Sequence, residues 1–323
     1  MNTAAGTARS TPPSLEVRST RTGCDGLGFG ASGTIGGRPA GPGRRRHLLA
    51  AARCPHLAGA DPAPHLWPGK DQHIPVPGWP YWIVCALEPG RSSWTAPLDA
   101  LRLAPGVETA TVIARQLRDL VERLITTGQG QTGHPDILII ADAGYDAPRL
   151  ALLLRNPPVQ VLARMRSDRV LRRPAPPREP HTRGRPPRHG GEFVFRHSDT
   201  WGTPDTETVT DTRLNGTALA RSWDRLHPKL THRSSWATAD GTPPIVEGTV
   251  IRLDIECLPS EATPRPVWLW WSETDADAAD TDRLWQAYLR RFDIEHTFRL
   301  FKQTLGWTCP KVRTPKRPTA GPG

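Results

Sequence analysis

The chain has 323 residues, with 42 Lys and Arg against 32 Asp and Glu, a formal net charge of +10, 35 Pro and 29 Gly. This length suits about two domains, and the basic charge favours a polyanionic partner such as nucleic acid. The chain has neither the roughly 18-residue apolar run of a membrane span nor an apolar leader, so we expect no membrane partner. Its five cysteines are widely spaced, so we expect no disulfide framework and a location in the reducing cytoplasm.

Residues 1–68 differ from the rest of the chain. They are rich in Gly and Arg and show neither period 2 nor period 3.6, so we expect a disordered segment that packs no core. Gly28 to Gly33 matches G-x-G-x-x-G, but without a strand before it and a helix after it a Gly-rich coil is favoured. Irregular spacing also argues against a zinc site among His47, Cys54, His56, His65 and His73.

Residues 69–165 contain the first strong patterns. Tyr81–Leu87 and Ser92–Leu103 predict a hairpin, and Val107–Ile125 carries apolar residues at helical spacing. In 136–142, four unbroken aliphatics predict a strand covered on both faces, as at the centre of an α/β sheet. A helix from about Ala147 and a strand over Val159–Met165 complete a βαβ order, which implies parallel strands.

Residues 166–265 predict a basic loop and a β-rich insertion. Ten Arg and three acids lie between 164 and 196, and Arg183-Gly184-Arg185-Pro186 matches the core of an AT-hook. We expect Arg183 and Arg185 to contact DNA, either in a minor groove or through general phosphate contacts. Within the β-like region that follows, one helix is predicted over Ala218–Leu226, and His227 and His232 are expected on the surface.

Residues 266–315 predict a final strand and the longest helix of the chain. The strand over Val267–Ser272 holds Trp268, Trp270 and Trp271, which on a short strand are more often core than a base-stacking surface. The helix pattern runs from Asp277 to about Gly306. Residues 316–323 are expected to be a disordered tail.

Two groups of residues point to chemistry. At 100° per residue, one face of the long helix carries Tyr288, Arg291, Glu295 and Lys302. Alone, this pattern also suits a solvated helix with ion pairs between successive turns. Asp142, however, follows the central strand, where α/β sheets bind ligands, and a carboxylate there needs a cation or a metal. Two acids with nearby Arg and Lys suit Mg²⁺ and phosphate, one carboxylate short of a two-metal phosphoryl-transfer site.

The spacing Tyr288-x2-Arg291-x3-Glu295-x6-Lys302 resembles the Y-x2-R-x3-E-x6-K signature of one branch of bacterial insertion-sequence DDE transposases, in particular a subfamily common in actinobacteria. The run Asp142-Ala-Gly-Tyr-Asp146 resembles the second catalytic block of that branch. The resemblance extends from about Gly69 to Pro315.

The resemblance implies a ribonuclease-H-like mixed sheet with flanking helices and a β-rich insertion. It implies that Asp142 and Glu295 are the second and third catalytic acids and bind two Mg²⁺ or Mn²⁺ ions. It also implies that Tyr288, Arg291 and Lys302 contact double-stranded DNA, and that a homodimer cleaves and joins DNA at paired transposon ends, in the cytoplasm at the nucleoid. In this division, 69–165 and 266–315 form the catalytic core.

The first catalytic acid is missing from its expected place. It should end the first strand, upstream of the predicted hairpin, but neither Asp61 nor Asp71 follows an apolar strand. GC-rich codons for residues 56–69 and 316–323 can be chosen so that a neighbouring frame resembles the family. The sequence therefore suggests a frame-damaged copy, and an inactive remnant that binds DNA nonspecifically stands beside an active transposase as the alternative. A basic protein without enzymatic ancestry is disfavoured by the helix signature.

Overall fold

The structure is a computed structural model. The residues that it describes are 48–54, 62–63, 76–77, 81–87, 93–129, 136–178, 183–213, 215–230, 236, 243–258 and 263–306. Side chains are described for these residues except in the first three ranges. The predictions for residues 1–47, Asp61, Asp71, His232 and residues 307–323 fall outside the described residues.

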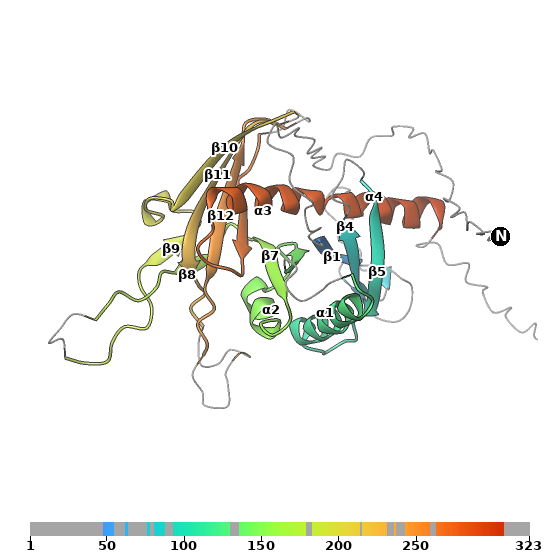
Figure 1. Ribbon diagram of the computed structural model, residues 1–323, viewed down its shortest axis with the longest axis horizontal. Helices are drawn as coiled ribbons and strands as arrows, with labels where there is room; N and C mark the ends of the chain where they lie inside the picture. Colours follow the sequence, from blue (N-terminus) through green and yellow to red (C-terminus); the bar gives the residue numbers. More distant parts are fainter. Residues whose placement is uncertain are drawn as a thin grey trace, which may run out of the picture.

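One nine-stranded sheet organises the described part of the chain, in the order β10-β11-β12-β13-β7-β6-β1-β4-β5 (Figure 1). Its first five strands along the chain are β1 (Leu48–Cys54), β4 (Tyr81–Leu87), β5 (Thr95–Arg102), β6 (Ile137–Ala141) and β7 (Val159–Met165). The strands β5, β4 and β1 are antiparallel neighbours, whereas β1, β6 and β7 are parallel. An antiparallel meander whose first strand is followed in the sheet by two strands parallel to it is the ribonuclease-H-like order, so the predicted fold class is confirmed.

Helices cover both faces of this sheet. The helices α1 (Thr109–Thr126) and α2 (Ala147–Leu153) pack in one core, and α3 (Ala278–Arg290) and α4 (Asp293–Arg299) pack in the other. All five residues of β6 are buried, and they alternate between the two cores. The unbroken aliphatic run was therefore correctly predicted as a central strand covered on both faces.

The predicted β-rich insertion continues the same sheet. Its strands β10 (Thr206–Thr212), β11 (Gly216–Leu226) and β12 (Gly248–Ile255) join the core through β13 (Val267–Trp271), which pairs with β7. The tryptophans of β13 are buried, which confirms the core interpretation. Two short ribbons lie outside this sheet: β2 (Pro62–Ala63) with β3 (Val76–Pro77), and β8 (Val170–Arg172) with β9 (Glu192–Val194). A single turn of 3₁₀ helix, Ser198–Thr200, follows β9.

Two predictions about secondary structure were wrong. The expectation that residues 1–68 form a disordered segment does not hold for β1, which pairs with β4 on one side and β6 on the other. Its sequence, Leu-Leu-Ala-Ala-Ala-Arg-Cys, has little β propensity of its own, so the neighbouring strands decide its conformation. The helix predicted over Ala218–Leu226 is part of β11, where Ala218, Ala220 and Ser222 are buried at period 2 between β10 and β12.

His227 is also misplaced by the sequence interpretation. It has no exposed surface, and its Nε2 lies 2.9 Å from Nδ1 of His189. Backbone hydrogen bonds in both directions join His227 to Arg172, at the base of the loop between β8 and β9. A polar residue just beyond a strand is expected at the surface from the sequence alone, but here Arg172 at the end of β8 pairs with His227.

Candidate active site

Asp142 follows β6 directly, at the carboxyl end of the central parallel strands. Because Leu138 and Ile140 belong to the core under α3 and α4, the alternation of the strand places Asp142 on that face. Its Oδ1 accepts a hydrogen bond from the backbone N–H of Ala143 at 2.8 Å. The side chain remains 40% exposed, so a ligand can reach the carboxylate.

Two residues of the predicted helix signature contact this carboxylate. The Tyr288 hydroxyl donates a hydrogen bond to Oδ1 of Asp142 at 3.3 Å, and a guanidinium nitrogen of Arg291 lies 3.3 Å from Oδ2. Arg291 is buried and its guanidinium stacks on the ring of Phe292, with 4.7 Å between its central carbon and the ring centroid. The sheet and the C-terminal helices therefore bring together Asp142, Tyr288 and Arg291. The expected contacts of Tyr288 and Arg291 with DNA stay predictions.

Burial keeps the Tyr288 hydroxyl protonated. The side chain is only 1% exposed, and this desolvation raises the pKa of Tyr288 to about 12. The nearby guanidiniums of Arg291 and Arg164 act in the opposite direction, and the Asp142 carboxylate adds to the increase. Tyr288 is consequently a hydrogen-bond donor to Asp142 at every physiological pH.

The long C-terminal helix is not uniform. Its α-helical hydrogen bonding is interrupted after Arg290, where Ile294 and Glu295 donate to backbone carbonyls three residues earlier. A π turn over Leu300–Thr304 then widens the helix and carries Lys302, which is half-buried. Tight and wide turns change the angle by which successive residues are rotated about the helix axis. The four residues predicted on one face therefore do not form a straight row: Tyr288, Arg291, Glu295 and Lys302.

Glu295 lies one turn beyond Arg291 and is exposed. Among the hydrogen bonds and ion pairs of the described residues, none involves its carboxylate. The helix that carries it is anchored across the sheet edge by a hydrogen bond between the hydroxyls of Thr297 and Thr95. The expected approach of the Asp142 and Glu295 carboxyl groups to about 4–8 Å stays a prediction.

Arg164 is a residue of this site that the sequence interpretation missed. Ile140 of β6 pairs with Leu162 of β7, so Arg164 is at the register position beside Asp142. It is close enough to Tyr288 to lower the pKa of that hydroxyl. The sequence does place Leu162 and Arg164 on one face of the predicted strand, but the register of that strand against the one before Asp142 is set by the sheet and cannot be read from the sequence alone.

The strand on the other side of β6 supplies no acid. Ala50 of β1 pairs with Ile140, so Ala52 is at the register position level with Asp142. All seven residues of β1 are aliphatic except Arg53 and Cys54. Within the described part of the chain, no three Asp, Glu, His or Cys side chains are grouped so that they could hold a metal ion.

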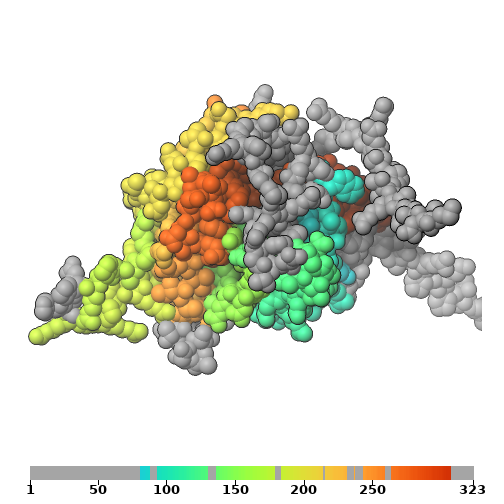
Figure 2. All heavy atoms as spheres, viewed as in Figure 1, coloured from blue at the N-terminus to red at the C-terminus, as the bar shows by residue number. Residues whose placement is uncertain are grey.

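Arg183 and Arg185 lie away from this site. Both are exposed on the Arg-rich loop between β8 and β9, which projects from the body of the molecule (Figures 1 and 2). In the portions of this loop that the structure describes, neither side chain has an ion pair. The helices of the described residues include none that is long and apolar enough to cross a membrane.

A family model for DDE superfamily endonucleases matches residues 65–229, which is half of the chain. The chain belongs to the DDE superfamily endonuclease family. The matched region of this family member includes Asp142 and ends before Glu295. No curated protein matches this chain. A solved structure that is similar to it is a piggyBac transposase synaptic complex with hairpin DNA, at 10% identity and a TM-score of 0.34. The match covers 81% of this chain and 41% of that one, so the chain spans about two fifths of the transposase's length.

Proposed function

We propose that this chain is the catalytic core of a DNA transposase that binds duplex DNA across the α3/α4 face, and that this copy no longer cleaves or joins strands. The observation that carries the proposal is the contrast at one sheet edge. Asp142 stands at the end of β6 between Tyr288 and Arg291, whereas β1 beside it contains no carboxylate. DNA binding needs the Lys and Arg side chains, whereas phosphoryl transfer on two metal ions also needs all three catalytic carboxylates.

Positive charge around Asp142 supports DNA binding. Arg291 and Arg164 both lie close to Tyr288, and Lys302 follows on the π turn. Exposed Arg183 and Arg185 add charge on the projecting loop. Lys and Arg side chains in such an arrangement bind phosphates and release counterions, which gives affinity without sequence specificity. Association with the nucleoid would follow from this binding.

A divalent ion fits the acids of the site in part. Asp142 and Glu295 would hold one Mg²⁺ or Mn²⁺, because hard cations accept two carboxylates together with phosphate oxygens. Such an ion would polarise a phosphate of the bound DNA. Placing metals on both sides of a scissile phosphate takes a further carboxylate, and the described residues around Asp142 offer none.

Loss of one acid removes nearly all catalysis because catalytic groups act as a unit. A frame-damaged gene would account for a β1 segment without an acid, since the segment would no longer encode the original strand. An active transposase in which Asp61 or Asp71 supplies the first acid is the competing function. The expected homodimer on paired DNA ends belongs to that active form.

A combined binding and cleavage assay tests the proposal. Duplex DNA carrying the sequences that flank the gene is titrated with the full chain at several salt concentrations, and strand cleavage is followed in Mg²⁺ and in Mn²⁺. We expect binding that weakens by about 10³-fold or more between 50 and 200 mM salt if about 6–10 phosphates are contacted, and no cut strands. Salt-insensitive binding would contradict the DNA interface. Cleavage that disappears in Glu295→Gln would contradict the loss of activity.

A further inference from the structure

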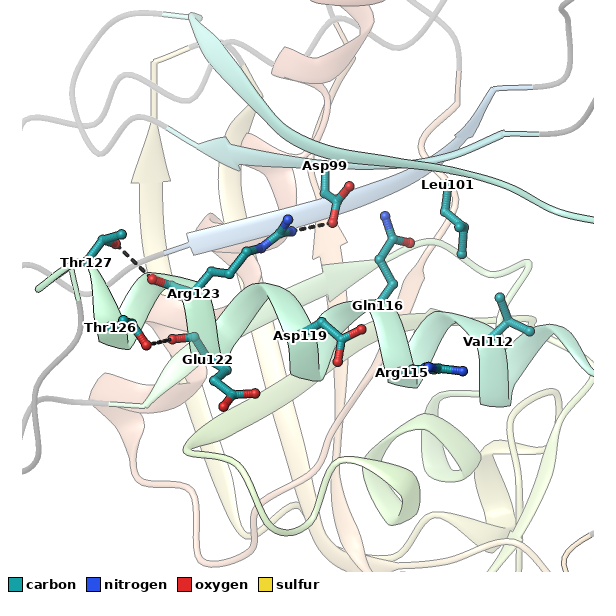
Figure 3. A pocket seen from close by; sticks show the side chains of 10 residues that line it. All are labelled: Asp99, Leu101, Val112, Arg115, Gln116, Asp119, Glu122, Arg123, Thr126 and Thr127. Atoms are coloured by element: carbon teal, nitrogen blue, oxygen red, sulfur yellow. Dashed lines mark hydrogen bonds and ion pairs between the residues drawn. The ribbon is translucent and has the colours of Figure 1, made fainter.

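The outward surface of α1 lies on the opposite face of the sheet from Asp142. Leu117, Leu120 and Val121 pack into the core, and the other side of the helix is exposed. A groove of about 900 Å³ runs between α1 and the edge strand β5 (Figure 3). Nothing in the proposed DNA interface uses this surface.

Four charged side chains on this surface have no ion-pair partner among the described residues: Arg115, Arg118, Asp119 and Glu122. Spacing of four residues would let Arg115 pair with Asp119 and Arg118 with Glu122, yet neither pair forms. Arg118 instead donates to the carbonyl of Ala114 at 3.3 Å. Figure 3 shows Arg115, Asp119 and Glu122 extending separately from the helix, whereas Arg123 turns towards β5 and pairs with Asp99 at 2.5 Å.

The order of residues along α1 is self-complementary about the point between Arg118 and Asp119. Counting outwards from that point, each of the four charged residues without an ion-pair partner corresponds to one of opposite charge, whereas Arg123, which pairs with Asp99, corresponds to the buried Ala114. The corresponding exposed or half-exposed residues are Arg118 with Asp119, Arg115 with Glu122, Val112 with Ile125, and Thr111 with Thr126.

We propose that α1 is a homodimer interface, in which two copies of this chain pack α1 against α1 in antiparallel orientation around a two-fold axis between Arg118 and Asp119. A two-fold interface applies the same patch to itself, so every correspondence in the sequence becomes a contact made twice. Four ion pairs would form at its centre, flanked by contacts of Val112 with Ile125. Ile125 is 40% exposed.

The charge pattern selects this occupant over DNA. The four central charges sum to zero, so the surface offers a polyanion as much repulsion as attraction. An antiparallel second copy meets opposite charge at every central position. This association goes beyond the proposed function, because it requires no DNA and leaves the α3/α4 face of each copy free.

Sedimentation of the full chain without DNA, over a range of protein concentrations, tests the interface. We expect a dimer whose dissociation constant rises with salt. Arg115→Glu and Glu122→Arg should each weaken it by at least about tenfold, because each creates two like-charge contacts across the axis. The double variant Arg115→Glu/Glu122→Arg should restore the dimer, since both symmetric pairs are exchanged together.

The charge exchange separates contacts between copies from contacts within one helix. Arg115 and Glu122 are seven residues apart, too far along α1 to pair with each other. An equimolar mixture of Arg115→Glu and Glu122→Arg chains should therefore form a heterodimer. Arg213→Glu, an exposed reversal after β10, is the matched control and should leave the dimer unchanged.

Circular dichroism confirms that each variant is folded before it is compared. A wild-type chain that stays monomeric at about 100 μM would overturn the proposal. A dimer that persists unchanged in both single variants would overturn it equally, because α1 would then lie outside the contact.

Discussion

The strands β6 and β1 are neighbours, run in the same direction and end at the same edge of the sheet. Only β6 is followed by a residue of the candidate active site. After β6 comes Asp142, held by Tyr288 and Arg291. In β1 the corresponding register position is Ala52, and no acid precedes or follows it within the strand. Both strands are nevertheless paired on both sides.

The comparison shows that a strand can complete the sheet without carrying an acid at its end. Strand pairing uses backbone groups, which every residue of β1 provides, so an altered sequence can still complete the sheet. Catalysis uses particular side-chain oxygens, and no neighbour can replace them. Under the proposed function, the fold and the activity of the chain would therefore be separable at this edge.

Restoring an acid in β1 is the change with the largest expected effect. Ala52→Asp places a carboxylate level with Asp142, so we expect Mn²⁺-dependent cleavage of duplex DNA to rise by about 10³-fold or more above the wild-type chain. The assay is the strand-cleavage measurement in Mn²⁺.

The control for this prediction is Ala52→Asn, which has a similar shape and no charge and should remain inactive. If Ala52→Asp folds and binds DNA but does not cut it, then β1 is not where the missing acid belongs.

Ile140 in β6 and Asp142 directly after it should contribute different amounts to the stability of the fold. Ile140→Ala should lower the free energy of unfolding by about 2–5 kcal/mol, because it leaves a cavity in a fully buried position. Asp142→Asn should cost less than this, since the Asp142 carboxylate is 40% exposed and solvent screens its ion pair with the buried Arg291. Urea unfolding of both variants measures this difference. A larger loss from Asp142→Asn than from Ile140→Ala would make Asp142 primarily a structural residue.

The projecting loop should contribute to DNA binding by charge alone. In the variant Arg183→Ala/Arg185→Ala, the slope of log affinity against log salt should fall by about 2, with a similar change on every DNA sequence. Fluorescence anisotropy with AT-rich and GC-rich duplexes gives both quantities. A loss confined to AT-rich DNA would instead favour minor-groove recognition by these two arginines.

Acid should weaken the base of the same loop slightly. Burial lowers the pKa values of both His189 and His227 below their usual value of 6.5, so the unfolded chain takes up protons first as the pH falls. The stability that the uncharged His189 and His227 contribute to the folded chain is present above about pH 6.5 and is lost as the pH falls below it. We expect the wild-type melting temperature to fall between pH 7.5 and 5.5 more than that of His189→Gln, measured by calorimetry. Equal changes in the two proteins would mean that the pair does not titrate in this range.

Long-range pairing explains what the sequence could and could not predict. The β6 run and the helix over 109–126 follow from local periodicity, so the sequence predicted them correctly. The contacts of Tyr288 and Arg291 with Asp142 join segments that are distant in the chain, and local spacing did not predict them. The strand β1 and the strand conformation of Ala218–Leu226 depend on neighbours that are distant in the chain, and local propensity gave the wrong answer.

The role of Arg164 escaped prediction for a related reason. Its place beside Asp142 depends on the register between β6 and β7, and register is set by the whole sheet. The self-complementary order of α1 is visible in the sequence, but its meaning depends on knowing which face of the helix the core leaves exposed.

The number of metal ions bound beside DNA tests the central claim most directly. Electron paramagnetic resonance of the chain with duplex DNA and Mn²⁺ distinguishes a single ion from two ions about 4 Å apart, because close pairs are spin-coupled. We predict a single, uncoupled Mn²⁺ that is lost in Asp142→Asn. A coupled pair in the wild-type chain would contradict the account, because a third carboxylate would then complete the site.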